Sequence, residues 1–496
     1  MKKYILNLTL FCSIFSFGQN INDALRYSQS DLGGTARFNS MSGAFGALGG
    51  DLSAISLNPA GSTVFANNQA GFSLRSFNVN NKSNYFGTKN SELESSIDLN
   101  QAGAVFVFES AEGSDWSKIA IGINYESTAN FDNSVFSSGT NRNSVANYFT
   151  SYANGIPLDY LSNYFFDELT YNEQQGFLGY QAYVINPATN SASNTEYYSN
   201  VPIGANYYQE NEFVSTGFNG KITFNGAVKY KDIFSIGLNL NSHFVDYTQS
   251  TSFYERNDFN NTSTDYLVKR LRFNNELYTY GSGFSVQVGT IIKPIKEIRL
   301  GLAYQSPTWY KLNDETRQSL AAVSGNVNEE LIPDIADPEL TLIYEPYKVR
   351  TAGSISGSIA YVFGKKGLFS FDYIMKNHED IQLKPNSDFA GENAYIASVL
   401  TNSSEYRLGA EYKIKNLSLR GGYRFEESPY KNGRTIGDLT GYSGGLGYNF
   451  GKTKVDAAYS YSQRFYDQQF FSQGLTDYST INAKNHNVTV SVLFEL

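Results

Sequence analysis

The sequence predicts an all-β fold: a transmembrane antiparallel β-barrel of about 14 strands, with an N-terminal hatch inside its lumen. Apolar and polar residues alternate with a period of two along most of the chain, and the links between these segments are by turns short and long. Aromatic residues make up 15% of the chain and charged residues only 17%, with a mean hydropathy of −0.36. Strands with one apolar and one polar face produce this balance, whereas helices that are apolar all round do not.

The N-terminus has the features of an export signal. Lys2 and Lys3 precede an apolar run that is too short to cross a bilayer as a helix. Ser16 and Gly18 are small residues at the −3 and −1 positions of a cleavage site. We therefore divide the 496 residues into a signal peptide, a hatch and a barrel with long extracellular loops, over 1–18, 19–68 and 69–496.

Cys12 is the only cysteine and offers a competing interpretation, a lipid anchor attached to its thiol. We disfavour it because Cys12 follows the bulky Phe11 inside the apolar run. Removal of residues 1–18 leaves no cysteine, which excludes disulfides and thiolate metal sites. Without Lys2 and Lys3, 36 basic residues remain against 47 acidic ones, a net charge near −11, so nucleic acid is not expected as a partner.

The alternating segments carry the fold prediction. In 234–241, for example, Phe, Ile, Leu and Leu alternate with Ser, Gly, Asn and Asn, and successive side chains of a strand point to opposite faces of the sheet. The segments have about the 9–11 residues of a tilted transmembrane strand. We expect them near 70–80, 101–109, 118–127, 220–230, 234–247, 280–292, 298–306, 350–363, 367–375, 404–414, 417–426, 440–450, 454–462 and 485–496.

The connections indicate which side each strand end faces. Short turns are expected at 231–233, 293–297, 364–366, 415–416 and 451–453, with a slightly longer one near 110–117. Long links separate the other segments, as in outer-membrane barrels with short periplasmic turns and long outer loops. Aromatic residues lie near many strand ends, as in interfacial girdles. The last segment resembles the closing strand that barrel-assembly machinery recognises, although it ends in Leu496 and not in an aromatic residue.

Residues 19–68 do not alternate and are rich in small residues. Glycine allows close approach of backbones, and Pro59 moves Asn58 away from the helical region. The stretch 36–61 resembles the hatch of the FadL/TodX family of outer-membrane transporters. The resemblance rests on an ordered run of a Gly-Ala pair, an acidic residue, Ser-Ala and Asn-Pro-Ala, here Gly43-Ala44, Asp51, Ser53-Ala54 and Asn58-Pro59-Ala60.

The family resemblance implies a barrel in a Gram-negative outer membrane, surrounded by lipid and lipopolysaccharide. It implies energy-independent uptake of hydrophobic small molecules such as long-chain fatty acids or aromatic hydrocarbons. The hatch residues Gly43, Ala44, Asp51, Asn58, Pro59 and Ala60 would then gate the lumen, and the ligand would leave sideways into the bilayer. Sideways exit is physically reasonable because each buried CH₂ gains about 0.8 kcal/mol.

Catalytic and metal chemistry find little support in the sequence. The three histidines, His243, His378 and His486, are not at ligand spacing, so neither a metal nor another cofactor is expected. His486 near Ser491 matches no hydrolase pattern. Gly281, Gly283 and the Gly421-Gly422 pair lie within strands and are interpreted as close-packing positions. We do not expect an enzyme.

Residues 144–169 interrupt the β pattern with apolar residues at helical spacing. They could form the small core of an outer loop or an exposed groove that captures apolar ligands. The sequence leaves both interpretations open.

The hairpin turn at 415–416 predicts that Glu411 lies opposite Arg420 and that Arg407 lies opposite Arg424, all on the lumen side. Two opposed arginines repel unless an anion lies between them. That anion could come from an acidic outer loop or a lipopolysaccharide phosphate, or it could be a substrate carboxylate bound by Arg407 and Arg424. Two other functions stay open: a non-conducting structural or adhesive barrel, which needs no hatch, and a general porin, which keeps an open lumen.

Overall fold

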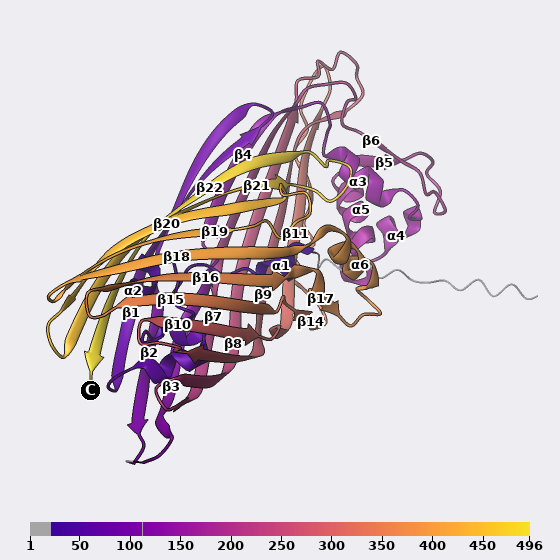
Figure 1. The fold of residues 1–496 in the computed structure, drawn as a ribbon. Coiled ribbons are helices and arrows are strands. Elements are labelled where there is room, and N and C mark those ends of the chain that lie inside the picture. Colours follow the sequence, from indigo (N-terminus) through magenta and orange to yellow (C-terminus); the bar gives the residue numbers. More distant parts are fainter. Residues whose placement is uncertain (1–20, 112) are drawn as a thin grey trace, which may run out of the picture.

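The computed structural model describes residues 21–111 and 113–496, so the predicted export signal lies outside the described part. Fourteen antiparallel strands form a closed barrel, because each pairs with the next along the chain and β1 pairs with β22 (Figure 1). The wall strands are β1 (Gln69–Tyr85), β2 (Thr88–Glu109), β3 (Trp116–Asn130), β7 (Tyr207–Tyr230), β8 (Phe234–Asn257), β9 (Leu267–Ile292), β10 (Ile298–Gln305), β15 (Ser354–Phe363), β16 (Gly367–Asn377), β18 (Asn402–Ile414), β19 (Leu417–Glu426), β20 (Ile436–Asn449), β21 (Thr453–Gln469) and β22 (Tyr478–Glu495).

All fourteen predicted segments coincide with wall strands, and the predicted alternation sets their faces. Ile119, Ile121 and Ile123 are between 44% and 53% exposed on the outer, lipid-facing side, whereas Ala120 between them is fully buried. No described helix has both the length and the apolar character needed to cross a bilayer.

The wall continues outward well beyond the predicted segments. β7, β8 and β9 have 24 to 26 residues each. β11 (Trp309–Gly325) continues β10 along β9 after an interruption at 306–308, in a region that the sequence suggested was a loop. Shorter outer strands are β4 (Asn133–Asn141), β12 (Asp334–Ala336), β13 (Leu342–Ile343), β14 (Tyr347–Arg350) and β17 (Gln382–Lys384). The 3₁₀ turn η4 (His378–Asp380) and the α-helix α6 (Ala390–Val399) lie between strands of the same region.

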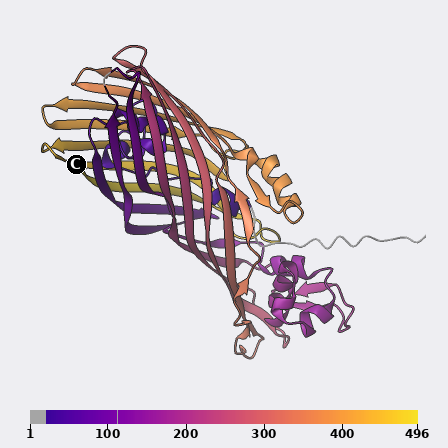
Figure 2. The same cartoon turned by 90° about the horizontal axis from the view of Figure 1, so that it is seen from below.

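A small outer domain interrupts the wall between β4 and β7. It contains α3 (Ala146–Ala153), α4 (Leu158–Asn163), η3 (Phe166–Glu168), α5 (Tyr171–Gln181) and a hairpin of β5 (Ile185–Pro187) and β6 (Tyr197–Ser199) (Figure 2). Val145, Phe149 and Leu161 are fully buried in its core together with Phe253 and Phe273 of β8 and β9. The apolar residues of 144–169 therefore form mainly a packed core, although Phe165 is 75% exposed.

The N-terminal segment, residues 21–68, lies between the walls (Figures 1 and 2). It contains α1 (Ile21–Arg26), α2 (Ala36–Ser40) and two short 3₁₀ turns, η1 (Ser53–Ser56) and η2 (Pro59–Val64). We call this segment the hatch. Its buried residues, Phe38, Met41, Phe45 and Leu48 among them, pack against Ala360 and Leu368 of the wall.

Candidate functional site

Asn58-Pro59-Ala60 lies against the wall formed by β7, β8 and β9. The Asn58 side chain donates to the carbonyl oxygens of Gly46, at 2.7 Å, and Thr290, at 3.0 Å, and accepts from the Ala60 amide. The wall has glycine where this turn approaches: a Cβ on Gly237 would lie 2.4 Å from the Pro59 carbonyl carbon, and one on Gly289 2.2 Å from the Asn58 Oδ1. The predicted hatch motif is thus fitted to glycines of the wall.

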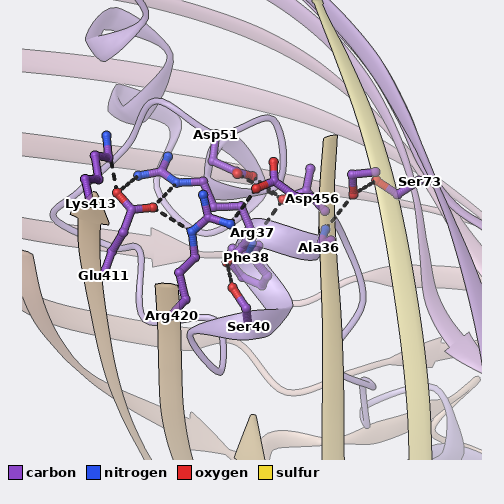
Figure 3. Close-up of polar contacts among 12 residues, drawn as sticks. Ala36, Arg37, Phe38, Ser40, Asp51, Ser73, Glu411, Lys413, Arg420 and Asp456 are labelled. Atoms are coloured by element: carbon purple, nitrogen blue, oxygen red, sulfur yellow. Dashed lines mark hydrogen bonds and ion pairs between the residues drawn. The ribbon is translucent and has the colours of Figure 1, made fainter. Parts of the chain in front are cut away.

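Asp51 is buried and holds two parts of the hatch together. Its carboxylate accepts from the Thr35 hydroxyl at 2.8 Å and from the Ser53 amide at 3.0 Å, while Thr35 caps α2 by accepting from the Phe38 amide (Figure 3). Burial raises the pKa of Asp51 above its usual value, although Arg37 and these hydrogen bonds oppose the shift.

A chain of charges joins α2 to the wall. Arg37 donates to Glu411 of β18 at 3.0 Å, Arg420 of β19 donates to the same carboxylate at 2.6 Å, and Arg420 also bonds to Asp456 of β21 (Figure 3). The pairing of Glu411 with Arg420 confirms the predicted register. On the other side of α2, the Ala36 amide donates to the hydroxyl of Ser491 in β22, which also bonds to Ser73 of β1.

Gly43 and Ala44 form the bend of the hatch that faces β18 and β19. Gly43 has a φ of +75°, a conformation that favours glycine, and Ala44 is fully buried. The preceding backbone lies so close to the wall that a Cβ on Gly422 would be 2.4 Å from the Met41 carbonyl carbon. Gly422 is therefore a close-packing position, as the sequence indicated.

Arg407 and Arg424 are directly opposite each other on the lumen side, as predicted. The anion between them is supplied by the chain itself. Glu405 bonds to Arg407 at 2.7 Å and to Arg424 at 2.6 Å, and Glu426 bonds to Arg424 at 2.7 Å. Arg407 also reaches the Gly43 carbonyl at 3.4 Å, so it contacts the hatch.

Sequence reasoning missed the rest of this buried charge cluster. Lys376 of β16 bonds to both Glu405 and Glu426, and Arg464 of β21 lies 3.5 Å from Glu426. Glu405 and Glu426 thus lie among four cations, and the buried Asp372 of β16 is directly opposite Arg407 on its other side. The signal was present, because residues two apart on a strand share a face, which places Glu405 beside Arg407 and Glu426 beside Arg424.

A cavity of ≈ 400 Å³ lies between the hatch and β20–β22. Its lining is both apolar and charged, with Leu32, Phe131, Phe213 and Leu439 on one hand and Arg26, Asp31, Arg424, Glu426 and Arg464 on the other. Two nitrogens of the Arg464 guanidinium, Nε and Nη2, are buried and make no hydrogen bond within the described residues, although Nη2 lies 3.5 Å from the Glu426 carboxylate. Arg407 does not line this cavity.

A second cavity of ≈ 280 Å³ shares Arg26, Asp31 and Phe131 with the first and reaches β3 and β4. Beside it the wall changes. Pairing of β2 with β3 ends at Gln101 and Glu126, although β2 continues to Thr88 and β3 to Asn130.

Hatch residues 31–34 occupy the free edge of β3 at this point. The Asp31 amide donates to the Thr128 carbonyl at 2.8 Å, the Asn130 amide donates to the Asp31 carboxylate at 3.0 Å, and Asn100 of β2 donates to the Gly34 carbonyl at 2.5 Å. The hatch therefore replaces the missing backbone pairing, while the Asn130 side chain of β3 still reaches β2 by donating to Asp98 at 2.6 Å and to Ser96 at 3.0 Å.

The histidines do not form a site. His243 faces the lumen beside Ser285 and Tyr310, His378 bonds to Ser403 in the outer region, and His486 bonds to Tyr459. Among residues 21–111 and 113–496, no three His, Cys, Asp or Glu side chains are grouped as metal ligands.

Comparison with known structures shows the same fold in outer-membrane transport proteins. A Pseudomonas aeruginosa FadL homologue superimposes with a TM-score of 0.55 at 12% identity, covering 94% of this chain and 99% of its own. The Pseudomonas putida toluene transporter TodX gives a TM-score of 0.51 at 13% identity, covering 95% and 100%. Comparison with curated protein sequences gives no match.

The sequence model of the family described as outer membrane protein transport protein (OMPP1/FadL/TodX) matches residues 179–492. This match excludes the hatch, so it is independent of the motif quoted above, and it covers well over half of the chain. The chain belongs to the OMPP1/FadL/TodX family of outer-membrane transport proteins.

Proposed function

We propose that the protein carries hydrophobic small molecules, such as long-chain fatty acids or aromatic hydrocarbons, passively across the outer membrane. The ligand enters the ≈ 400 Å³ cavity, passes to the adjoining one and leaves sideways between β2 and β3. The observation that carries the proposal is the position of the missing β2–β3 pairing, which lies beside the second cavity and is bridged by residues 31–34 of the hatch.

The surroundings of this break favour exit into lipid. Ile97 and Leu99, in the part of β2 that is not paired with β3, are 79% and 45% exposed. An apolar ligand that leaves here meets apolar side chains and hydrocarbon, and each methylene that stays out of water gains about 0.8 kcal/mol.

The proposal assigns different roles to two parts of the hatch. Residues 36–64 are fixed by the Asn58 turn, the Arg37 ion pair and the Thr63–Ser235 hydrogen bond. Residues 31–34 are held to the strands at the break by the three hydrogen bonds described above. A shift of residues 31–34, together with release of the Asn130 side chain from Asp98 and Ser96, opens the gap. Movement of the whole hatch requires buried charges to separate.

Two engineered disulfides test this division, since no other cysteine remains after removal of the export signal. Asp31→Cys with Asn130→Cys locks the segment at the wall break, and Thr63→Cys with Ser235→Cys, whose hydroxyl oxygens are 2.8 Å apart, locks the base. We expect the first lock to abolish uptake of a radiolabelled fatty acid until a reductant is added. The second lock should leave uptake unchanged. Unchanged uptake with the first lock oxidised contradicts lateral exit at this break.

An anionic ligand would place its carboxylate at the charge cluster. Arg424 and Arg464 line the cavity, whereas Arg407 acts indirectly by holding Glu405. We expect Arg464→Gln to lower uptake of a fatty acid several-fold more than uptake of an uncharged hydrocarbon of similar size. Equal losses for both ligands would assign the cluster to stability alone.

The open alternatives give different results in the same assays. A general porin passes small polar solutes in planar bilayers, and an adhesive barrel passes neither solutes nor hydrocarbons. Within the cell we propose that lipopolysaccharide surrounds the barrel and that the barrel-assembly machinery inserts it, with β22 as the strand recognised.

A further inference from the structure

Three lysines lie side by side on the outer face of the wall. Lys311 of β11 is directly opposite Lys348 of β14, and Lys348 is directly opposite Lys384 of β17. All three are exposed. Figure 1 shows β14 and β17 beside α6 at the outer end of the barrel. We call these residues the lysine row.

The alternation of burial fixes the direction in which the row points. Leu312, Tyr347, Val349 and Leu383, the neighbours of the three lysines along the strands, are buried in one apolar cluster with Ile396 of α6. That cluster covers the inner face of the strands, so the lysine side chains leave from the outer face.

The row lies just beyond the lipid-facing apolar band. Trp309, two residues before Lys311 on the same face, is 48% exposed and pairs with Phe284, which is 47% exposed. An exposed tryptophan at this level is typical of the aromatic girdle at the membrane surface. The lysine row begins one pleat further out, roughly 7 Å along the strand, which is the level of lipid phosphates.

The row has no internal counter-charge. Across residues 21–111 and 113–496, neither the three lysines nor Arg350, which pairs with Trp309, makes an ion pair with a carboxylate. The nearest carboxylate along β11 on the same face, Glu315, is four residues further out. Like charges at directly opposed positions destabilise a sheet.

We propose that the lysine row binds the phosphate groups of a phosphorylated glycolipid of the lipid A type in the outer leaflet. Opposed Cβ atoms on neighbouring strands are about 5 Å apart, so the three ammonium groups can reach more than one phosphate of a single headgroup. The acyl chains would then pack against Trp309, Phe284 and the apolar band below. The charge, the exposure and the level of the row all match this one occupant.

The test compares binding of purified bis-phosphorylated lipid A with binding of the same glycolipid after removal of its phosphates, counted by native mass spectrometry. The variant carries Lys311→Gln, Lys348→Gln and Lys384→Gln. The matched control removes three exposed lysines from the periplasmic turns, Lys296→Gln, Lys365→Gln and Lys366→Gln. Heat-modifiable migration in gels verifies that both variants fold.

We expect the wild-type chain to prefer the phosphorylated lipid, and each lysine removed from the row to weaken binding about fivefold. The control variant should bind as the wild type does. Equal binding of phosphorylated and stripped lipid, or equal losses in both triple variants, overturns the proposal. The proposal also fails if inorganic phosphate at the same phosphate concentration displaces the lipid completely. It fails as well if the protein forms a dimer without lipid and only the row variant loses that dimer, because the row is then a protein interface.

Discussion

Glu405 is the residue whose loss should be most costly, because it is the shared counter-ion of the buried charge cluster. Its side chain is completely buried and lies 2.7 Å from Arg407, 2.6 Å from Arg424 and 3.1 Å from Lys376. Glu405→Gln keeps the shape but removes the negative charge that Arg407, Arg424 and Lys376 share. Breaking a buried ion pair from one side costs roughly 3–5 kcal/mol, and we expect Glu405→Gln to destabilise the barrel by about that amount.

The measurement is the midpoint of unfolding in urea, followed by heat-modifiable migration and by tryptophan fluorescence in detergent micelles. A double variant separates charge from packing: Glu405→Gln with Arg424→Gln removes one cation together with its partner and should recover about half of the lost stability. If Glu405→Gln costs less than about 1 kcal/mol and the second substitution recovers nothing, the cluster does not stabilise the barrel in the way argued.

Three further predictions concern the hatch. Gly237→Val should cost about 1–3 kcal/mol and displace the Asn58 turn, because the added carbon meets the Pro59 backbone. Gly226→Val is the control, because Gly226 lies on the neighbouring strand with open space around it. Equal dye permeability of the two variants would contradict the described contact between Gly237 and the Asn58 turn. Deletion of residues 36–62 should leave a heat-modifiable barrel with raised conductance in planar bilayers, and loss of folding would make the hatch a structural support. Because burial raises the pKa of Asp51, its charged form opposes folding, so stability should increase as pH falls from neutral through that pKa, and Asp51→Asn should remove this part of the pH dependence in unfolding titrations.

The strands were predictable where lipid lies on one side of the wall and the lumen on the other. There the difference in exposure between Ile119 and Ala120 corresponds to an alternation of residue types with a period of two in the sequence. Outside the membrane both faces meet water or protein, the contrast fades, and β11 and the outer half of β8 could not be distinguished from loops.

The hatch motif was predictable from the sequence, but the wall residues that it contacts were not. Gly237 contacts the Asn58 turn and Gly226 contacts nothing, yet both are single glycines within alternating strands. The alternation places Gly226 on the lipid face and Gly237 on the lumen face, but only the folded barrel shows that the Asn58 turn is what approaches Gly237. The partners of Arg407 and Arg424 were predictable in principle, because Glu405 and Glu426 share their face, whereas Lys376 and Arg464 come from strands that are distant in sequence.

The seam between β1 and β22 joins the first wall strand to the last, so it can form only after the whole chain has been made. Until then β1 has an unpaired edge, the kind of surface that recruits other chains into aggregates. Ser491 lies in this seam and bonds both to Ser73 across it and to the Ala36 amide of the hatch. One hydroxyl group thus couples the position of α2 to the closure of the barrel. A chain whose last strand has not yet paired lacks both the bond across the seam and the bond to α2.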